Sequence, residues 1–495
     1  MNYIKNVLSS VNVFSILAVF LGTWSSMWAQ WENPVVDTIT NTQVRKETRL
    51  QSLCIDDSGM VHLVWKHQRT VGWRIFYCTN SPSGIWGAPQ EVTDSTQVNF
   101  DPAITWWSQS GVPFVVYEHN SEICSAYLSG GLWQMYPVTI NAQFDRSPAV
   151  AIDGWGLPHA AWITVDTATA EYKIAYATGY LVGPNISWSV QTLAGSELGP
   201  YGSGASPFMA VTADGVAHIV YRGGDYGNYH IHHAWNEAQG GIDWQYEILY
   251  SGNANDYSAS MVIEENGNYH LAVSGNDGWG FPGRVYYFHK PYGQVWQQYE
   301  LASLGGSAVE PALAVDCYGA PHIVWMETSG NFYTGNVYYS GKDSTSAWQV
   351  SLVIGGDHFS PSFQVDQLGY GHVACHTGGN TSVYDIYHVK SSSVLTNVDE
   401  FENPIIGSGS AYLLRNYPNP VRTHTEVFYV LKYPGHVTLK VYNSIGEEVT
   451  TLVDETKLSG MHSVVWRPQD LSAGIYFFHL ISNRSEKNRK CILLP

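Results

Sequence analysis

Residues 147–162 read SPAVAIDGWGLPHAAW, and this stretch carries the pattern that decides the fold. A proline leads an apolar run, an Asp-x-x-Gly turn follows, and a histidine then opens a second apolar run that ends in an aromatic residue. The pattern recurs along the chain at steps of 45 to 59 residues. The positions that correspond to the histidine are His62, Phe114, His159, His218, His270, His322 and His372. Self-similarity at this period indicates one supersecondary unit repeated seven times.

Each repeat continues with two further short runs. The first carries a tyrosine, as in IFY at residues 75–77, and a turn then leads to a run that starts with tryptophan, as at Trp86. Four β runs separated by Gly, Asn, Asp or Pro turns make up each unit, and helical periodicity is absent. We therefore predict an all-β chain whose main part is a seven-bladed β-propeller with four-stranded blades.

The last repeat lacks its tryptophan-led run, and the missing piece stands at the other end of the chain. Residues 31–40 read WENPVVDTIT, which matches the fourth-strand sequence that begins at Trp86. We expect residues 31–40 to form the outer strand of the last blade. The N-terminal strand would then close the ring and leave no long sheet edge exposed.

The repeated histidines and tyrosines are interpreted as structural, because one blade position that carries the same residue type in six repeats is set by blade packing. The cysteines have irregular spacing and no C-x-x-C pair, so we predict isolated buried thiols and neither a metal site nor a cofactor. They are Cys54, Cys78, Cys124, Cys317, Cys375 and Cys491.

Residues 1–29 have the pattern of a signal peptide. Lys5 supplies a positive start, residues 11–21 form an apolar segment of signal-peptide length, and Ala29 is a plausible cleavage site. No later segment is long and apolar enough to span a bilayer. We expect an exported protein with no membrane span in the mature chain.

The composition changes near residue 391, which divides the rest into a propeller at 30–390, a linker at 391–410 and a small β-sandwich at 411–495. The last part resembles the type A C-terminal sorting domain of bacterial type IX secretion cargo, although Val421 stands where phenylalanine is usual. The resemblance implies contact with the type IX machinery and an extracellular or outer-surface location in a Gram-negative bacterium of the Bacteroidota type. The matching motif residues are Asn416, Pro418, Asn419, Pro420, Gly446, Gly460 and Gly474.

The charge is divided unevenly between the two parts. The whole chain carries −18, of which the tail contributes +3 from ten basic and seven acidic residues, so the remainder carries −21. Nucleic-acid binding needs a basic surface, so this acidic body argues against it.

The blades are similar to those of secreted bacterial sialidase-like propellers. The turns before Trp86 and Trp133 resemble degenerate Asp-boxes, in which the Asp and the following Thr are missing. No set of three arginines can be assigned to hold a substrate carboxylate, so the resemblance implies a fold and no activity.

Candidate site residues lie in the loops of one propeller face, between the second and third strands and between blades. Glu118 and Glu327 are candidates for a general acid or base, and His67, His119 and His376 are candidates for a general base. Ligand contacts fall to Lys66, Arg69, Arg222, Asp225 and Asp277, with Trp107 and Trp279 as aromatic platforms for sugar rings. The interblade loops add Asp101, Asp145, Arg146, Glu310 and His358.

Three functions remain open from the sequence. The first is a secreted module that binds an extracellular glycan or protein, and the second is a glycoside hydrolase or polysaccharide lyase. The third is a structural surface protein. The lack of an arginine triad and the scarcity of basic residues favour binding over catalysis.

Overall fold

The computed structural model describes most of the chain after residue 30. The described residues are 31, 34–40, 44–70, 72–81, 83–93, 98–140, 144–166, 170–182, 185–196, 198, 206–225, 228–238, 241–250, 258–264, 266–275, 283–300, 307–316, 319–328, 335–342, 348–378, 384–395, 411–417, 419, 421–431, 434–457, 460–469, 471–482 and 485–494. The predicted signal peptide and most of the predicted linker lie outside them.

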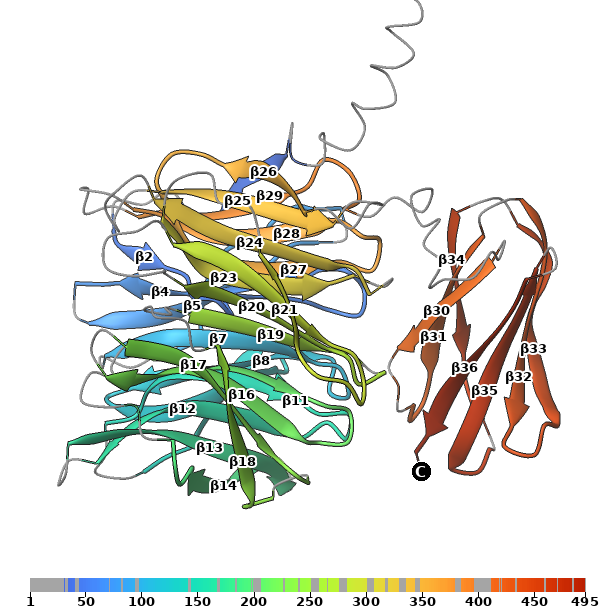
Figure 1. Cartoon of the computed structure of the whole chain (residues 1–495), viewed down its shortest axis with the longest axis horizontal. Coiled ribbons are helices and arrows are strands. Elements are labelled where there is room, and N and C mark those ends of the chain that lie inside the picture. Colours follow the sequence, from blue (N-terminus) through green and yellow to red (C-terminus); the bar gives the residue numbers. More distant parts are fainter. Residues whose placement is uncertain are drawn as a thin grey trace, which may run out of the picture.

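Within these residues the chain is all β, and its strands form antiparallel sheets arranged as blades (Figure 1). Seven of the sheets come before residue 391, and we number them in chain order. Sheet 1 holds β2 (Lys46–Glu47), β3 (Leu53–Ile55), β4 (Val61–Gln68), β5 (Trp73–Thr79) and β6 (Gln90–Glu91). Sheet 2 holds β7 (Asn99–Trp107), β8 (Val112–His119), β9 (Glu122–Ser129) and β10 (Leu132–Pro137). Sheet 3 holds β11 (Arg146–Ile152), β12 (Pro158–Asp166), β13 (Glu171–Val182) and β14 (Asn185–Thr192).

The remaining four sheets repeat this arrangement. Sheet 4 holds β15 (Phe208–Val211), β16 (Ala217–Asp225), β17 (Asn228–Asn236) and β18 (Trp244–Tyr250). Sheet 5 holds β19 (Ser258–Ile263), β20 (Tyr269–Gly275), β21 (Arg284–Lys290) and β22 (Gln297–Glu300). Sheet 6 holds β23 (Ser307–Val315), β24 (Pro321–Thr328), β25 (Gly335–Lys342) and β26 (Trp348–Ile354). Sheet 7 holds β27 (His358–Val365), β28 (Gly371–Thr377), β29 (Ile386–Lys390) and β1 (Val35–Thr38).

Consecutive sheets pack face to face and share apolar clusters. Between sheets 2 and 3, for example, the side chains of Phe114 and Trp162 are fully buried in one cluster. Leu63 of sheet 1 is likewise buried in a cluster with Ala374 and Ile386 of sheet 7. Burial of apolar faces between neighbouring blades is the main stabilising contribution in a fold of this kind.

The outer strand of sheet 7 comes from the N-terminal side of the chain. β1 pairs antiparallel with β29, with Val36 opposite Val389, which matches the sequence-based expectation for residues 31–40. Asp37 accepts hydrogen bonds from Trp86 Nε1 at 3.0 Å and lies 3.2 Å from His388 Nδ1. These contacts join β1 to β29 of sheet 7 and to Trp86, which precedes β6 of sheet 1.

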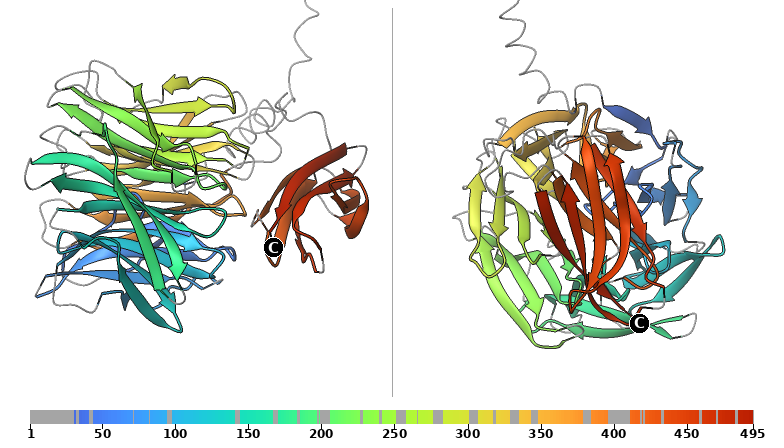
Figure 2. Two further views of the ribbon diagram at one scale, coloured as in Figure 1. Left: turned by 90° about the horizontal axis from the view of Figure 1, so that it is seen from below. Right: turned by 90° about the vertical axis from the view of Figure 1, so that its right-hand side faces the viewer.

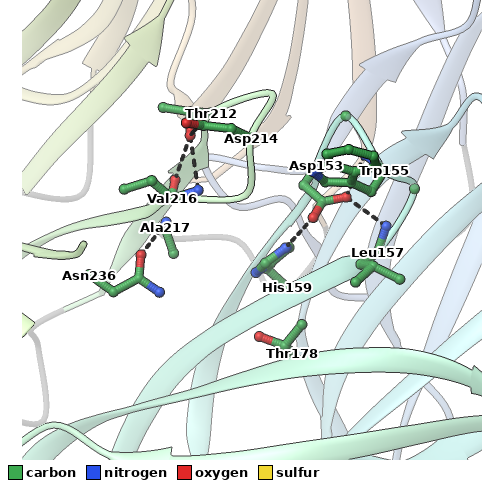
Figure 3. A network of polar contacts seen from close by, with 12 residues as sticks. Asp153, Trp155, Leu157, His159, Thr178, Thr212, Asp214, Val216, Ala217 and Asn236 are labelled. Carbon is green, nitrogen blue, oxygen red and sulfur yellow. Dashed lines mark hydrogen bonds and ion pairs between the residues drawn. The ribbon is translucent and has the colours of Figure 1, made fainter. Parts of the chain in front are cut away.

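The repeated histidines are buried and hydrogen-bonded within their blades, which confirms the structural interpretation. In sheet 3, His159 Nε2 lies 3.2 Å from Asp153 Oδ2, and His159 Nδ1 lies 2.6 Å from the Tyr176 hydroxyl (Figure 3 shows the histidine and the aspartate). The other carboxylate oxygen of Asp153 accepts the backbone N–H groups of Trp155 and Leu157, which holds the Asp-x-x-Gly turn.

Sheet 4 builds the same network with different residues. Thr212 replaces the aspartate, and its hydroxyl accepts the backbone N–H of Val216 in the turn beside Asp153 (Figure 3). His218 then pairs with His233 at 3.0 Å, and His233 pairs with Glu247 at 2.9 Å. In sheet 3 the carboxylate of the network comes from Asp153 in the turn, whereas in sheet 4 it comes from Glu247 on the outer strand β18.

The C-terminal residues form two further sheets that share one apolar core (Figure 2, orange to red). One sheet holds β30 (Ala411–Tyr417), β31 (Thr425–Leu431) and β34 (Gly460–Trp466). The other holds β33 (Glu448–Lys457), β32 (Gly435–Asn443), β35 (Gly474–Ser482) and β36 (Ser485–Leu493). Tyr429, Leu439 and Phe478 are fully buried in the core between them.

Four of the five described cysteines are buried, as the sequence predicted, and Cys124 is partly buried. Burial raises the pKa of each thiol for which a shift is resolved, as for Cys124, whose pKa rises to about 12. The described part of the chain also contains no helix long and apolar enough to cross a membrane.

Candidate ligand-binding site

One cavity of about 340 Å³ lies where the innermost strands of the seven sheets begin, and its volume falls within the range of small-molecule sites. Arg49, Leu50 and Gln51 from sheet 1 line it together with residues that precede or open β7, β11, β15, β19, β23 and β27. The other lining residues are Asp101, Pro102, Ala103, Ser147, Pro148, Ser206, Pro207, Phe208, Arg222, Ser258, Val309, Glu310, Met326, Phe359 and Ser360.

A repeated backbone irregularity places many of these side chains at the cavity. In five sheets the residue before the leading proline has a positive φ, between 31° and 54°. These five residues are Asp101, Ser147, Ser206, Glu310 and Ser360. Four of the innermost strands also shift register at this point, as β-bulges do. The left-handed conformation is unfavourable for residues with a Cβ, yet it recurs at the same point of five sheets beside the cavity.

The other two sheets depart from this pattern. In sheet 5, Ser258 takes the place of the residue before the proline. In sheet 1, Leu50 and Gln51 replace the dipeptide, and the Gln51 side chain reaches across to the backbone of β11 and β15. The equivalent backbone positions therefore carry acidic, hydroxyl, amide and apolar groups around one space.

Asp101 is the most strongly paired acid of the cavity. Its carboxylate lies 2.7 Å from Arg49 Nη2 and 3.4 Å from Lys66 Nζ, and it accepts a hydrogen bond from Ser147 Oγ at 3.3 Å. Burial would raise its pKa, but the positive charges of Arg49 and Lys66 outweigh burial and lower the pKa to about 2. Asp101 is therefore ionised at neutral pH.

Glu118 lies on β8 opposite Phe100, next to the bulge that contains Asp101. Burial and the negative charge of Asp101 raise the pKa of Glu118 to about 7. The two neighbouring carboxyl groups thus titrate far apart, a division typical of sites that hold one acid and one base. Glu118 does not line the cavity itself.

Arg222 and Glu310 face the same cavity from sheets 4 and 6. The guanidinium of Arg222 lies 4.5 Å from the centre of the Tyr229 ring, a cation–π contact that restricts its position. Glu310 Oε2 is shielded from solvent and accepts no hydrogen bond within the described residues. Buried carboxylate oxygens nearly always have a donor, so this atom is a natural ligand contact.

The other predicted catalytic residues do not line the cavity. His376 is buried, with Nδ1 2.9 Å from the Thr48 hydroxyl, and burial lowers its pKa to about 3. His119 Nδ1 lies 2.8 Å from Asn99 Oδ1. His67 is buried against Phe76, and burial lowers its pKa to about 4, while Glu327 accepts a hydrogen bond from Trp325.

The predicted ligand contacts are scattered. Arg222 lines the cavity, and Lys66 lies behind it between Glu47 and Asp101. Arg69 is on the outer side of sheet 1, where it pairs with Glu91. Asp225 ends β16 and its side chain is not described, and Asp277 and Trp279 lie outside the described residues.

The prediction that Trp107 is an exposed platform for a sugar ring is wrong. Trp107 ends β7 and is only 1% exposed, because its indole packs against Phe114 and donates a hydrogen bond to the Gly156 carbonyl at 2.9 Å. Among the interblade residues, Asp101 and Glu310 line the cavity, whereas Asp145, Arg146 and His358 precede the bulges and do not.

Sequence reasoning missed Gln51 and the serines of the cavity. The signal for the serines was present, because each of Ser147, Ser206 and Ser360 directly precedes a leading proline. Among the described residues, no group of three or more His, Cys, Asp or Glu side chains is placed to hold a metal ion.

The sorting-motif residues lie at structural points of the C-terminal sheets. Asn416 is buried and donates to Thr425 Oγ1 at 3.3 Å, and Asn419 accepts the backbone N–H of Ile492 at 2.9 Å. Gly446 has a φ of 85° in the turn after β32, where a residue with a Cβ would be strained. Gly460 and Gly474 begin β34 and β35, while Pro418 and Pro420 are outside the described residues.

Comparison with known proteins identifies the tail. Residues 415–494 match the family described as the secretion system C-terminal sorting domain. This sorting domain directs the protein through the type IX secretion system to the cell surface or the extracellular space of a Gram-negative bacterium of the Bacteroidota type. No curated protein is similar enough in sequence to count as a relative.

Three solved structures are similar at low identity. The polysaccharide lyase Uly1 aligns with 70% of this chain and 90% of its own, at 11% identity and a TM-score of 0.44. PorZ, a surface component of the type IX secretion system of Porphyromonas gingivalis, aligns with 90% of this chain and 60% of its own, at 9% identity and a TM-score of 0.39. The α-L-arabinofuranosidase Arb93A of Fusarium graminearum aligns with 60% of this chain and 94% of its own, at 15% identity and a TM-score of 0.44.

Proposed function

We propose that this exported protein is a seven-bladed β-propeller, closed by its N-terminal strand, which binds an extracellular glycan in its central cavity. The observation that carries the proposal is the set of five residues with a positive φ, Asp101, Ser147, Ser206, Glu310 and Ser360, that line one space. Blade packing would favour equivalent side chains at equivalent positions. Variation at these repeated positions therefore supports a ligand site built on a regular scaffold.

The chemistry of the cavity suits a glycan better than a protein surface. Carboxylates accept hydrogen bonds from sugar hydroxyls, Arg222 and the serines can donate to them, and Phe208 and Met326 offer apolar contact to the C–H faces of a sugar ring. A protein partner would need a buried area of about 800 Å² on each side, which a concave site of this size does not offer.

The division of the chain follows from the same proposal. Residues 1–29 act as the signal peptide, 30–390 form the propeller and 391–410 link it to the sorting domain at 411–495. The sorting domain contacts the type IX machinery during export. The propeller then binds its glycan outside the cell.

The test is a panel of oligosaccharides titrated into the whole protein by calorimetry. Arg222→Ala should weaken the binding of a retained sugar by roughly tenfold or more, because it removes a charged donor from the cavity. Arg69→Ala is the matched control, since that guanidinium pairs with Glu91 on the outer side of sheet 1. Equal affinity in both variants would refute the cavity as the binding site.

Glycoside hydrolysis is a second candidate, supported by one observation. Glu118 has a pKa raised to about 7 beside the ionised Asp101, and hydrolysis uses one protonated and one ionised carboxyl group. The test measures product release from the sugars that bind. Turnover that Glu118→Gln abolishes while binding persists would support a hydrolase, and binding without turnover in the native protein would exclude it for those sugars.

A further inference from the structure

Glu310 is the one charged side chain of the cavity that presents a buried oxygen without a donor in the described part of the chain. It occupies the bulge before Pro311 in β23, with a φ of 54°, and its Oε2 is shielded from solvent. A desolvated carboxylate oxygen without a hydrogen-bond donor is unfavourable. The site is therefore suited to a ligand that brings a donor to this atom.

The charges that line the cavity balance. Arg49 and Arg222 are the cations, Asp101 and Glu310 are the acids, and Arg49 already pairs with Asp101 at 2.7 Å. An anionic ligand would lose its hydration and meet Glu310 without any surplus of positive charge to compensate. A cationic ligand would satisfy Glu310 but would also face two arginines.

A neutral, hydroxyl-rich ligand avoids both penalties. A sugar hydroxyl both donates and accepts, so the same ring can donate to Glu310 and accept from Arg222. The hydroxyl groups of Ser147, Ser206 and Ser360 line the same space and can take either role.

We propose that the cavity selects a neutral saccharide and that one of its hydroxyl groups donates a hydrogen bond to Glu310 Oε2. This inference rests on the proposed glycan-binding function and specifies the class of glycan. It makes Glu310 the residue that discriminates against acidic sugars such as uronates.

The experiment compares three probes by calorimetry with the whole protein: neutral xylo- and manno-oligosaccharides, galacturonate oligosaccharides and glucosamine oligosaccharides. We expect only the neutral probes to bind the native protein tightly. Glu310→Gln should weaken the neutral probe by roughly tenfold, the effect of losing a hydrogen bond to a charged group, and should strengthen galacturonate binding. The control is Glu91→Gln, which changes an exposed carboxylate on the outer side of sheet 1.

Two outcomes would overturn the inference. Tighter binding of galacturonate than of neutral sugars by the native protein, lost in Arg222→Ala, would refute neutral selection and leave glycan binding intact. A cooperative thermal transition shows that the protein is folded. If no probe binds this folded protein, both the proposed function and the inference are refuted. Glu310→Ala, measured beside Glu310→Gln, separates the loss of the acceptor from a change in fold.

Discussion

The side-chain amide of Gln51 and the backbone of Val150 exchange two hydrogen bonds. Val150 N donates to Gln51 Oε1 at 3.1 Å, and Gln51 Nε2 donates to the Val150 carbonyl at 3.4 Å. The same Nε2 lies 3.5 Å from the Met209 carbonyl. Gln51 belongs to sheet 1, whereas the other two residues belong to sheets 3 and 4, so this one side chain joins sheets that are not neighbours. It stands where five other sheets have a proline, and it bounds the cavity.

Gln51→Ala should therefore lower the free energy of unfolding by about 1–2 kcal/mol, since it leaves the Val150 N–H and carbonyl without their partner. Urea unfolding followed by tryptophan fluorescence measures the change. Gln109→Ala is the control, because Gln109 is exposed. Equal midpoints for the two variants would mean that the bridge across the cavity contributes nothing to stability.

A second prediction concerns His388, which makes the protein sensitive to acid. Burial lowers the pKa of His388 to about 4, although Asp37 acts in the opposite direction. The folded state thus binds fewer protons than the unfolded state between pH 4 and the ordinary histidine pKa near 6.5, so stability is full above pH 6.5 and falls as the pH drops through this window.

His388→Tyr tests this effect with a residue that the repeat itself supplies. Tyr77, Tyr176, Tyr287 and Tyr339 occupy the same position in four other sheets, and each pairs with the repeated histidine of its own sheet. We expect urea midpoints to fall less between pH 7 and pH 4.5 in the variant than in the native protein. A parallel fall in both would show that His388 contributes nothing to the acid sensitivity.

The bulge residues provide a third prediction. Ser360 has a φ of 47°, and glycine adopts this conformation without the steric penalty of a Cβ. Ser360→Gly should raise the free energy of unfolding by about 0.5–1 kcal/mol. Ser362→Gly serves as the comparison, since Ser362 is a normal strand residue that accepts the backbone N–H of Leu53, and it should lower stability. A loss of stability in Ser360→Gly would argue against strain at the bulge.

A fourth prediction concerns Trp31. It precedes β1, is 3% exposed and packs at 5.6 Å, centre to centre, against the Tyr339 ring. Trp31→Ala should cost about 3–5 kcal/mol, the usual penalty for removing a buried tryptophan. Trp155→Ala, at a residue 43% exposed, should cost under about 1 kcal/mol. If thermal unfolding gave similar losses for both, the segment before β1 would not anchor the outer strand of sheet 7.

The blades were predictable from the sequence, because the sequence pattern that specifies their strands recurs in each repeat. The repeated histidine position, as at His159, the tyrosine that follows it in most repeats and the outer strand of the last sheet all follow from comparison of one repeat with the next. A network such as that of Asp153 and His159 recurs because the same local spacing produces the same geometry in several blades.

The site was less predictable, because its side chains are positioned by deviations from the repeat. Trp107 breaks the pattern and looked like an exposed ring, yet the edge of the neighbouring sheet covers it. The sequence shows that Ser147 and Glu310 each precede a leading proline, but their approach to the cavity depends on the positive φ that the backbone adopts in the bulge. Gln51 contacts Val150 and Met209, which lie 99 and 158 residues further along the chain, a relation that only the folded structure reveals.

The pairing of β1 with β29 sets an order of events for a protein that is exported. Val35 faces Lys390, so the first described strand has no partner in its sheet until more than 350 further residues have been made. Sheet 7 is therefore the last of the seven sheets before residue 391 that can be completed, and the sorting domain follows it in the chain. A chain interrupted anywhere before β29 lacks the strand that pairs with β1, so sheet 7 is completed only shortly before the sorting domain is made.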